Sequence, residues 1–125
     1  MRYIIASGPV IIEKGKVVLV KHGKDKFWKF PGSSVRGKES FEECAKKRVK
    51  GELGINVKLI RPIKPMIVHR KNEKIILIHY IAKRKGKIKP GKHIHEWKWF
   101  NINKLPKDAG PNIKSVIKAL TARSP

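Results

Sequence analysis

Residues 28–55 carry the strongest local signals in this chain, and they place one helix within a series of strands. Ser40 and Glu43 have the spacing of a capping box, in which each side chain satisfies a backbone amide that the first helical turn leaves unpaired. Apolar residues recur at helical spacing over Phe41–Val49 and predict one buried helix face. Gly54 suits the left-handed residue that often follows a helix. We therefore predict a helix from near Ser40 to Gly54.

Apolar, β-branched segments lie on both sides of this helix and predict strands. They are Tyr3–Ile12, Val17–Lys21, Phe27–Phe30, Val57–Ile63, Met66–Arg70, Lys74–Ala82 and His95–Asn101. Pro111 suits the first turn of a closing helix. One face of that helix is apolar and comprises Ile113, Val116, Ile117 and Leu120. This order predicts an α/β chain, folded as an α/β/α sandwich on a mixed β-sheet.

The composition predicts one domain and an intracellular setting. The 125 residues suffice for a single core, so residues 1–125 are expected to form one domain. Cys44 is the one cysteine, which excludes an internal disulfide and fits a reducing compartment. The N-terminal apolar run is short and broken, unlike a signal peptide, and no run approaches the roughly 20 residues of a membrane span. We expect a cytoplasmic protein with no membrane partner.

The charge balance points to a polyanionic partner. Lys and Arg number 31 against 9 Asp and Glu, which gives a net charge of +22. Self-repulsion at this charge destabilises a compact fold unless an anion neutralises it, and nucleic acid is the commonest such partner. A Lys-rich proteome bias is the alternative, but such a bias usually raises Glu together with Lys. Glu is scarce here, which favours nucleic acid.

A spaced motif overlaps the predicted helix. Its positions are Ser33, Glu39, Lys47, Arg48, Val49, Gly51, Glu52, Gly54 and Ile55. An aromatic-x-hydrophobic-Pro-Gly sequence precedes it at Trp28–Gly32, and a Trp-rich strand with a Leu-Pro turn follows at Glu96–Pro106. This pattern resembles that of the Nudix superfamily, of MutT-like type. The resemblance covers most of the chain and implies the α/β/α sandwich described above.

The resemblance also implies where the chemistry of this chain departs from its family. Family members hydrolyse nucleoside diphosphate derivatives with Mg²⁺ or Mn²⁺ held by glutamates of the box helix. Positions 48, 51 and 52 share one helix face, and the family has Glu at all three, a formal charge of −3. Here Arg48, Gly51 and Glu52 contribute +1, 0 and −1, a sum of zero. The resemblance therefore implies a degenerate site without a confident catalytic or metal-binding set, and no required cofactor.

The substituted face is suited to phosphate instead of a cation. Arg matches phosphate oxygens through its planar fork of donors. A basic Gly/Pro segment, Lys83–Lys92, is predicted to be a loop that orders on nucleic acid; a solvated hairpin tip is the alternative. The candidate phosphate-binding or nucleic-acid-binding residues are Arg36, Lys38, Lys47, Arg48, Lys83, Arg84, Lys85, Lys87, Lys89 and Lys92.

The remaining acids have both a structural and a catalytic interpretation. Glu39 lies near the helix N-terminus, where it favours the helix dipole, and Glu52 is predicted to pair with Arg48, worth about 0.3 kcal/mol if exposed. If the chain is active, Glu52, Glu39 and Glu96 are the catalytic candidates, and Glu52 with Glu96 would hold Mg²⁺ or Mn²⁺. We favour the structural interpretation because the ligand set is incomplete.

Histidine, cysteine and aromatic side chains are further candidate sites. His93 and His95 lie on one side of a predicted strand, with His69 and His79 in other strands, and ordinary strand histidines are favoured over a metal site. Cys44 lies on the apolar helix stripe and is expected in the core. Aromatic residues are candidates for base stacking, about half of them being expected in the core. They are Trp28, Phe30, Tyr80, Trp97 and Trp99.

Three functional hypotheses follow. The leading one is an RNA-binding module that contacts structured RNA, including ribosomal RNA, with its substituted box face. The alternative is a metal-dependent Nudix hydrolase of a nucleoside diphosphate derivative or an RNA 5′ end. The third is a nucleotide sensor that binds without hydrolysis.

Overall fold

Two long parallel strands form the centre of the sheet. The structure is a computed structural model and describes residues 2–121. Strand β1 (Arg2–Glu13) runs parallel to β6 (Glu73–Lys85), aligned from Arg2 with Glu73 to Ile11 with Ala82. The remaining strand pairs are antiparallel, so the sheet is mixed, as predicted.

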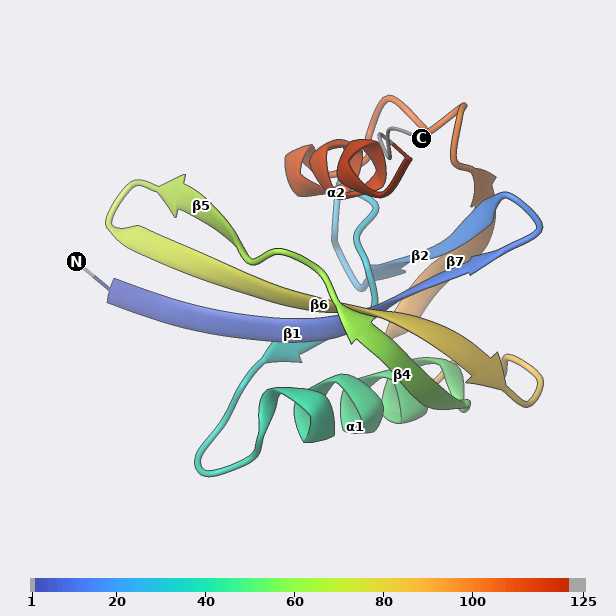
Figure 1. The fold of residues 1–125 in the computed structure, drawn as a ribbon, viewed down its shortest axis with the longest axis horizontal. Coiled ribbons are helices and arrows are strands. Elements are labelled where there is room, and N and C mark those ends of the chain that lie inside the picture. The colour runs from blue at the N-terminus through green and yellow to red at the C-terminus, as the bar shows by residue number, and fades with distance from the viewer. Residues whose placement is uncertain (1, 122–125) are drawn as a thin grey trace.

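The other strands extend the sheet on both sides of this central pair. The order is β4-β6-β1-β2-β7, with β5 also paired to β6 and β3 paired to β1. These strands are β2 (Lys16–His22), β3 (Ser33–Ser34), β4 (Asn56–Pro62), β5 (Met66–Arg70) and β7 (Ile94–Asn101). Helix α1 (Phe41–Leu53) and helix α2 (Pro111–Thr121) cover opposite faces of the sheet, which gives the predicted α/β/α sandwich (Figure 1).

The ends of α1 form as the sequence indicates. Ser40 Oγ accepts a hydrogen bond from the Glu43 amide at 3.0 Å, and Glu43 Oε1 accepts one from the Ser40 amide at 3.3 Å. Gly54 has a φ of 68° and closes the helix in the left-handed conformation. Both predicted boundaries of α1 are confirmed.

Alternation along the strands divides the core into two layers. On the α1 side, Ile11 and Val18 pack with Val49 and Leu53 of the helix. On the α2 side, the neighbouring residues of the same strands pack with the buried face of α2. That second cluster includes Val10, Val17, Leu19, Ile113, Val116 and Ile117. Because both faces are covered here, β1 and β2 are apolar without interruption at these positions.

One predicted strand and one predicted strand end were wrong. Residues 27–30 do not form a regular strand, since Lys29 makes an isolated bridge to Val20 and Trp28 makes another to Ala109. Pro31 lacks an amide hydrogen and cannot continue such a ladder. Strand β6 runs on to Lys85, so the segment predicted as a loop from Lys83 begins inside a strand that pairs with β4.

Within residues 2–121, no helix is long and apolar enough to cross a membrane. Cys44 is fully buried in α1, as the sequence predicts.

Candidate functional site

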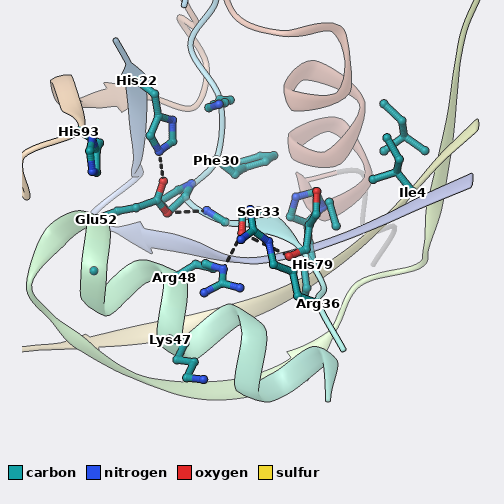
Figure 2. Close-up of a pocket in the computed structure, with 18 of the residues that line it drawn as sticks. Ile4, His22, Phe30, Ser33, Arg36, Lys47, Arg48, Glu52, His79 and His93 are labelled. Atoms are coloured by element: carbon teal, nitrogen blue, oxygen red, sulfur yellow. Dashed lines mark hydrogen bonds and ion pairs between the residues drawn. The ribbon is translucent and has the colours of Figure 1, made fainter. Parts of the chain in front are cut away.

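A cavity of about 810 Å³ lies between the sheet, residues 29–34 and the last two turns of α1 (Figure 2). Its apolar side is formed by Ile4, Phe30 and Ile75. Its charged side is formed by residues of α1 and of the segment before it. That side comprises Lys29, Arg36, Lys47, Arg48 and Glu52, with His22 and His93 at one end.

Two glycines allow the chain to build this cavity. A Cβ on Gly8 of β1 would overlap the carbonyl of Pro31, and a Cβ on Gly32 would overlap the carbonyl of Ser7. Gly32 also has a φ of 140°, which a side chain would disfavour. Because the two backbones touch, Ser33 is held in the β3 pairing with Ser7. Strand β3 and the Gly32 amide are thereby presented to α1.

Arg48 occupies the middle of the inner face of α1. Its Nε donates to Ser33 Oγ at 2.6 Å, and its Nη2 donates to Glu39 Oε1 at 3.2 Å. The Arg36 amide also donates to Glu39 Oε1, at 2.9 Å. This backbone hydrogen bond holds the pKa of Glu39 below its usual value despite the opposing effect of burial, and the Arg48 charge acts in the same direction. Glu39 therefore stays ionised and orients the Arg48 guanidinium.

Glu52 is held by a different set of groups. Its Oε1 accepts a hydrogen bond from the Gly32 amide at 2.8 Å, and its Oε2 forms an ion pair with His22 Nε2. His22 is in turn fixed by Asp25, because the Asp25 carboxylate accepts a hydrogen bond from the His22 backbone amide at 2.8 Å. The predicted Arg48–Glu52 pair was therefore wrong. Glu39 comes to Arg48 from the loop before α1, while the end of β2 brings His22 to Glu52.

Gly51 leaves an opening in this side of the cavity. A Cβ at position 51 would meet no atom within 4 Å, so the space that a side chain would fill is open. The carbonyl of Gly51 is covered instead, because a Cβ on Gly91 would overlap it. The position lies in the last turn of α1, where the cost of a helical glycine is smaller than in a helix centre.

The basic loop after β6 packs on this end of α1. The Lys89 amide donates to the Leu53 carbonyl at 2.7 Å, and the Gly91 amide donates to the Glu52 carbonyl at 2.8 Å. These contacts satisfy carbonyls that a helix end leaves unpaired. The loop is therefore attached to the helix, and Lys87, Lys89 and Lys92 within it are exposed.

The other predicted phosphate contacts are placed differently. Lys83 and Lys85 are exposed on β6. Arg84 is engaged by Glu13 in a two-pronged pair, with both N–O distances at 2.8 Å, which raises the pKa of Arg84 and lowers that of Glu13. Lys38 is exposed in the loop before α1 and does not line the cavity.

The acids do not assemble into the metal site that the family resemblance implies. Within residues 2–121, no group of three or more His, Cys, Asp or Glu side chains is placed to hold a metal ion. Glu39 Oε1 accepts hydrogen bonds from the Arg36 amide and from Arg48, and Glu52 Oε1 accepts one from the Gly32 amide, while Glu52 Oε2 lies against His22 Nε2. Glu96 is exposed on β7 next to His95 and does not line the cavity. With Arg48 and Gly51 in place of two family acids, the described residues bring too few oxygen ligands together to fit Mg²⁺ or Mn²⁺.

The remaining candidates separate into core and cavity residues. Trp28, Phe30 and Tyr80 are buried, while Trp97 and Trp99 are partly buried against the α1-side core. His79 packs edge-on against Phe30 with ring centroids 5.0 Å apart, and burial lowers its pKa to about 4. His22 was missed, since a lone histidine at the end of a strand carries no motif.

Comparisons with known proteins agree with this fold. A MutT NUDIX hydrolase from Burkholderia pseudomallei superposes with a TM-score of 0.87 at 19% identity, covering 97% of this chain and 100% of that chain. The MutT protein from Methanosarcina mazei Go1 gives 0.83 at 21%, over 94% and 91%. A UDP-X diphosphatase gives 0.82 at 18%, over 96% of this chain and 64% of that chain. At these identities the likeness shows the fold alone.

No curated protein matches the chain in sequence. The family model described as NUDIX domain matches residues 1–120. Since this match spans nearly the whole chain, the protein belongs to the NUDIX domain family.

Proposed function

We propose that this Nudix-domain chain is an RNA-binding module that contacts phosphates of structured RNA, ribosomal RNA included, directly with the cationic side of its cavity. The observation that carries the proposal is the position of Arg48. It takes the place of a family carboxylate, and Ser33 and Glu39 orient its guanidinium on the cavity side of α1. An oriented guanidinium is a strong phosphate ligand because little freedom is lost when it binds.

The distribution of charge supports this proposal. All nine acids lie within residues 2–121, and in that part of the chain their ion pairs occupy five Lys or Arg side chains. Those five are Arg2, Lys21, Lys29, Arg48 and Arg84. Of these, Arg48 is expected to contact phosphate while still paired with Glu39, and the large surplus of the remaining cations is available to an external polyanion. Arg36 and Lys47 at the cavity, with the lysines of the basic loop, form one part of that surplus.

Binding to a structured RNA, such as a ribosomal RNA fragment, as a function of salt tests the proposal. We expect log K to fall linearly with log salt, in EDTA as well as in Mg²⁺, because counterion release dominates such complexes. Arg36→Gln and Lys47→Gln should each reduce the magnitude of the slope by about one. Lys114→Gln, an exposed lysine on α2 across the sheet, is the matched control and should change the slope less. Absence of a complex at low salt would exclude this function.

A metal-dependent hydrolase is the second candidate, and one observation favours it. Glu52, a retained family acid, still lines the cavity. Solved structures similar to this one include a protein described as a UDP-X diphosphatase. Turnover of a nucleotide panel or of RNA 5′ ends in Mg²⁺ or Mn²⁺ would establish this candidate, provided that Glu52→Gln removes it. Residual activity should also respond to Glu39→Gln and Glu96→Gln if these acids take part. We expect no turnover, since Arg48 and Gly51 replace two of the three clustered family acids.

A further inference from the structure

The far end of the sheet carries an apolar surface that neither helix covers. Strand β5 and the first halves of β1 and β6 extend past both α1 and α2 (Figure 1). One surface of this extension, which we call the open face, consists of Tyr3, Ile5, Ile67, His69, Lys74 and Ile76. Tyr3 is 66% exposed and Ile67 is 51% exposed.

Strand alternation fixes which side of the sheet the open face occupies. Ser7 and Tyr80 share its parity, because Ser7 continues the odd positions of β1 and Tyr80 continues the even positions of β6, with which those odd positions pair. Their side chains bond to α1: Ser7 Oγ donates to the Phe41 carbonyl, and Tyr80 donates to Glu42, each at 2.8 Å. The open face thus lies on the α1 side of the sheet, beyond the start of that helix.

The register arranges the open face as two rows across three strands. Tyr3 is aligned with Lys74, and Lys74 is aligned with His69. In the second row, Ile5 is aligned with Ile76, which is aligned with Ile67. The Lys74 ammonium lies 6.0 Å from the centroid of the Tyr3 ring. An aromatic ring with a cation over one of its faces therefore adjoins an aliphatic strip.

This combination suits an unpaired base better than it suits a second copy of the chain. Bases of single-stranded nucleic acid stack on exposed aromatic rings of sheet surfaces, and nearby cations contact their phosphates. Lys74 on the face and Arg70 and Lys71 at the adjoining turn supply such cations. The acid nearest in sequence, Glu73, has the opposite strand parity and pairs with Arg2 at 3.6 Å. A second copy would instead bring one chain of charge +22 against another.

We propose that the open face is a second RNA contact that stacks unpaired bases, with Tyr3 beneath one base and the Ile5–Ile76–Ile67 row beneath its neighbour. The inference rests on the proposed RNA-binding function. It assigns the single-stranded part of a structured RNA to this surface, and the phosphates of the remainder to the cavity side of α1.

Fluorescence anisotropy with a labelled single-stranded oligouridylate and a labelled RNA duplex tests the assignment. Tyr3→Ala should weaken binding of the single strand about tenfold and leave duplex binding unchanged, because only an unpaired base offers its face for stacking. Tyr3→Phe keeps the ring and should bind like the unmodified chain. Phe27→Ala is the matched control, since Phe27 is a second aromatic of similar exposure, at 57%, that lies outside the open face.

Ile67→Thr provides a second variant that keeps a β-branched residue, and thermal unfolding of each variant reports that it folds. If Tyr3→Ala and Ile67→Thr both bind the single strand with unchanged affinity, the inference is overturned. Salt-dependent binding of the duplex would in that case still support the proposed function. A dimer in sedimentation that Tyr3→Ala dissociates would also overturn it, because a second copy would then cover the face. No binding to any RNA would reject the proposed function itself, and the inference with it.

Discussion

The cavity and the open face both use residues of β1, β5 and β6, yet their surfaces differ in kind. In the cavity, Arg48 and Glu52 are each held by at least two named partners. On the open face, Tyr3 and Ile67 extend from the strands with much of their area exposed. The first surface favours a ligand with fixed charges and directional acceptors. The second favours flat groups, which bind through contact area and do not require directional hydrogen bonds.

The largest expected difference between the two regions is in stability. Leu53 is fully buried where α1 meets the sheet beside the cavity, so Leu53→Ala should cost about 3 kcal/mol in free energy of unfolding. Ile67→Ala on the open face should cost about 0.5 kcal/mol, because half of that side chain is already exposed. Denaturant unfolding measures both changes. Similar costs would contradict the view that the open face contributes little to folding.

Restoring the family acids should remove the phosphate surface. Arg48→Glu together with Gly51→Glu changes the charge of the α1 face by −2 and −1, a total of −3, and position 51 has open space for the new side chain. Affinity for duplex RNA should fall by about two orders of magnitude. Mn²⁺, measured by calorimetry, should bind the double variant more tightly than the unmodified chain. An unaltered RNA affinity would place the phosphates elsewhere.

Acid should destabilise the cavity wall through His79. Burial depresses its folded-state pKa to about 4 from an ordinary value near 6.5, so below pH 6.5 the unfolded chain binds a proton that the folded chain excludes. The contribution is complete above pH 6.5 and is lost as the pH falls towards 4. Between pH 7.5 and 5 it amounts to about 2 kcal/mol.

The variant His79→Gln separates this effect from that of the acids. Its free energy of unfolding should vary less with pH than that of the unmodified chain over the same interval. Equal pH dependence of the two proteins in denaturant titrations would assign the acid sensitivity to carboxylates such as Glu39 instead.

The smallest expected effect concerns the start of α1, between the two regions. Ser40→Ala removes the acceptor for the Glu43 amide and should cost about 1 kcal/mol. Ser40→Asp keeps an acceptor and should retain most of the stability. Thermal unfolding compares the stability of the two variants. An equal loss of stability in both would mean that the capping hydrogen bond does not stabilise the helix.

The parts of the fold that the sequence predicts well are those with local causes. The capping residues Ser40 and Glu43, the stop at Gly54 and the closing helix at Pro111 depend on neighbours in the chain. The extension of β6 to Lys85 was missed because its cause is distant: β4 supplies the partner residues. A run of basic residues has no local signal for a strand.

The candidate site shows the same division. The spacing of the box placed Arg48 and Glu52 on one helix face, and both line the cavity. Their partners were not predictable, since Ser33 and His22 arrive from strands on other parts of the sheet. Tyr3 was not a candidate because its segment has the composition of an ordinary buried strand, although the residue is 66% exposed.

The attachment of the basic loop to the end of α1 has a thermodynamic consequence. A free basic arm loses conformational entropy when it closes on a polyanion, and this loss weakens binding and makes it sensitive to temperature. Here the Lys89 and Gly91 amides are already bonded to α1, so most of that entropy is lost during folding. The loop should therefore act as a rigid, positively charged surface. Its affinity for a polyanion should depend on ionic strength far more than on temperature.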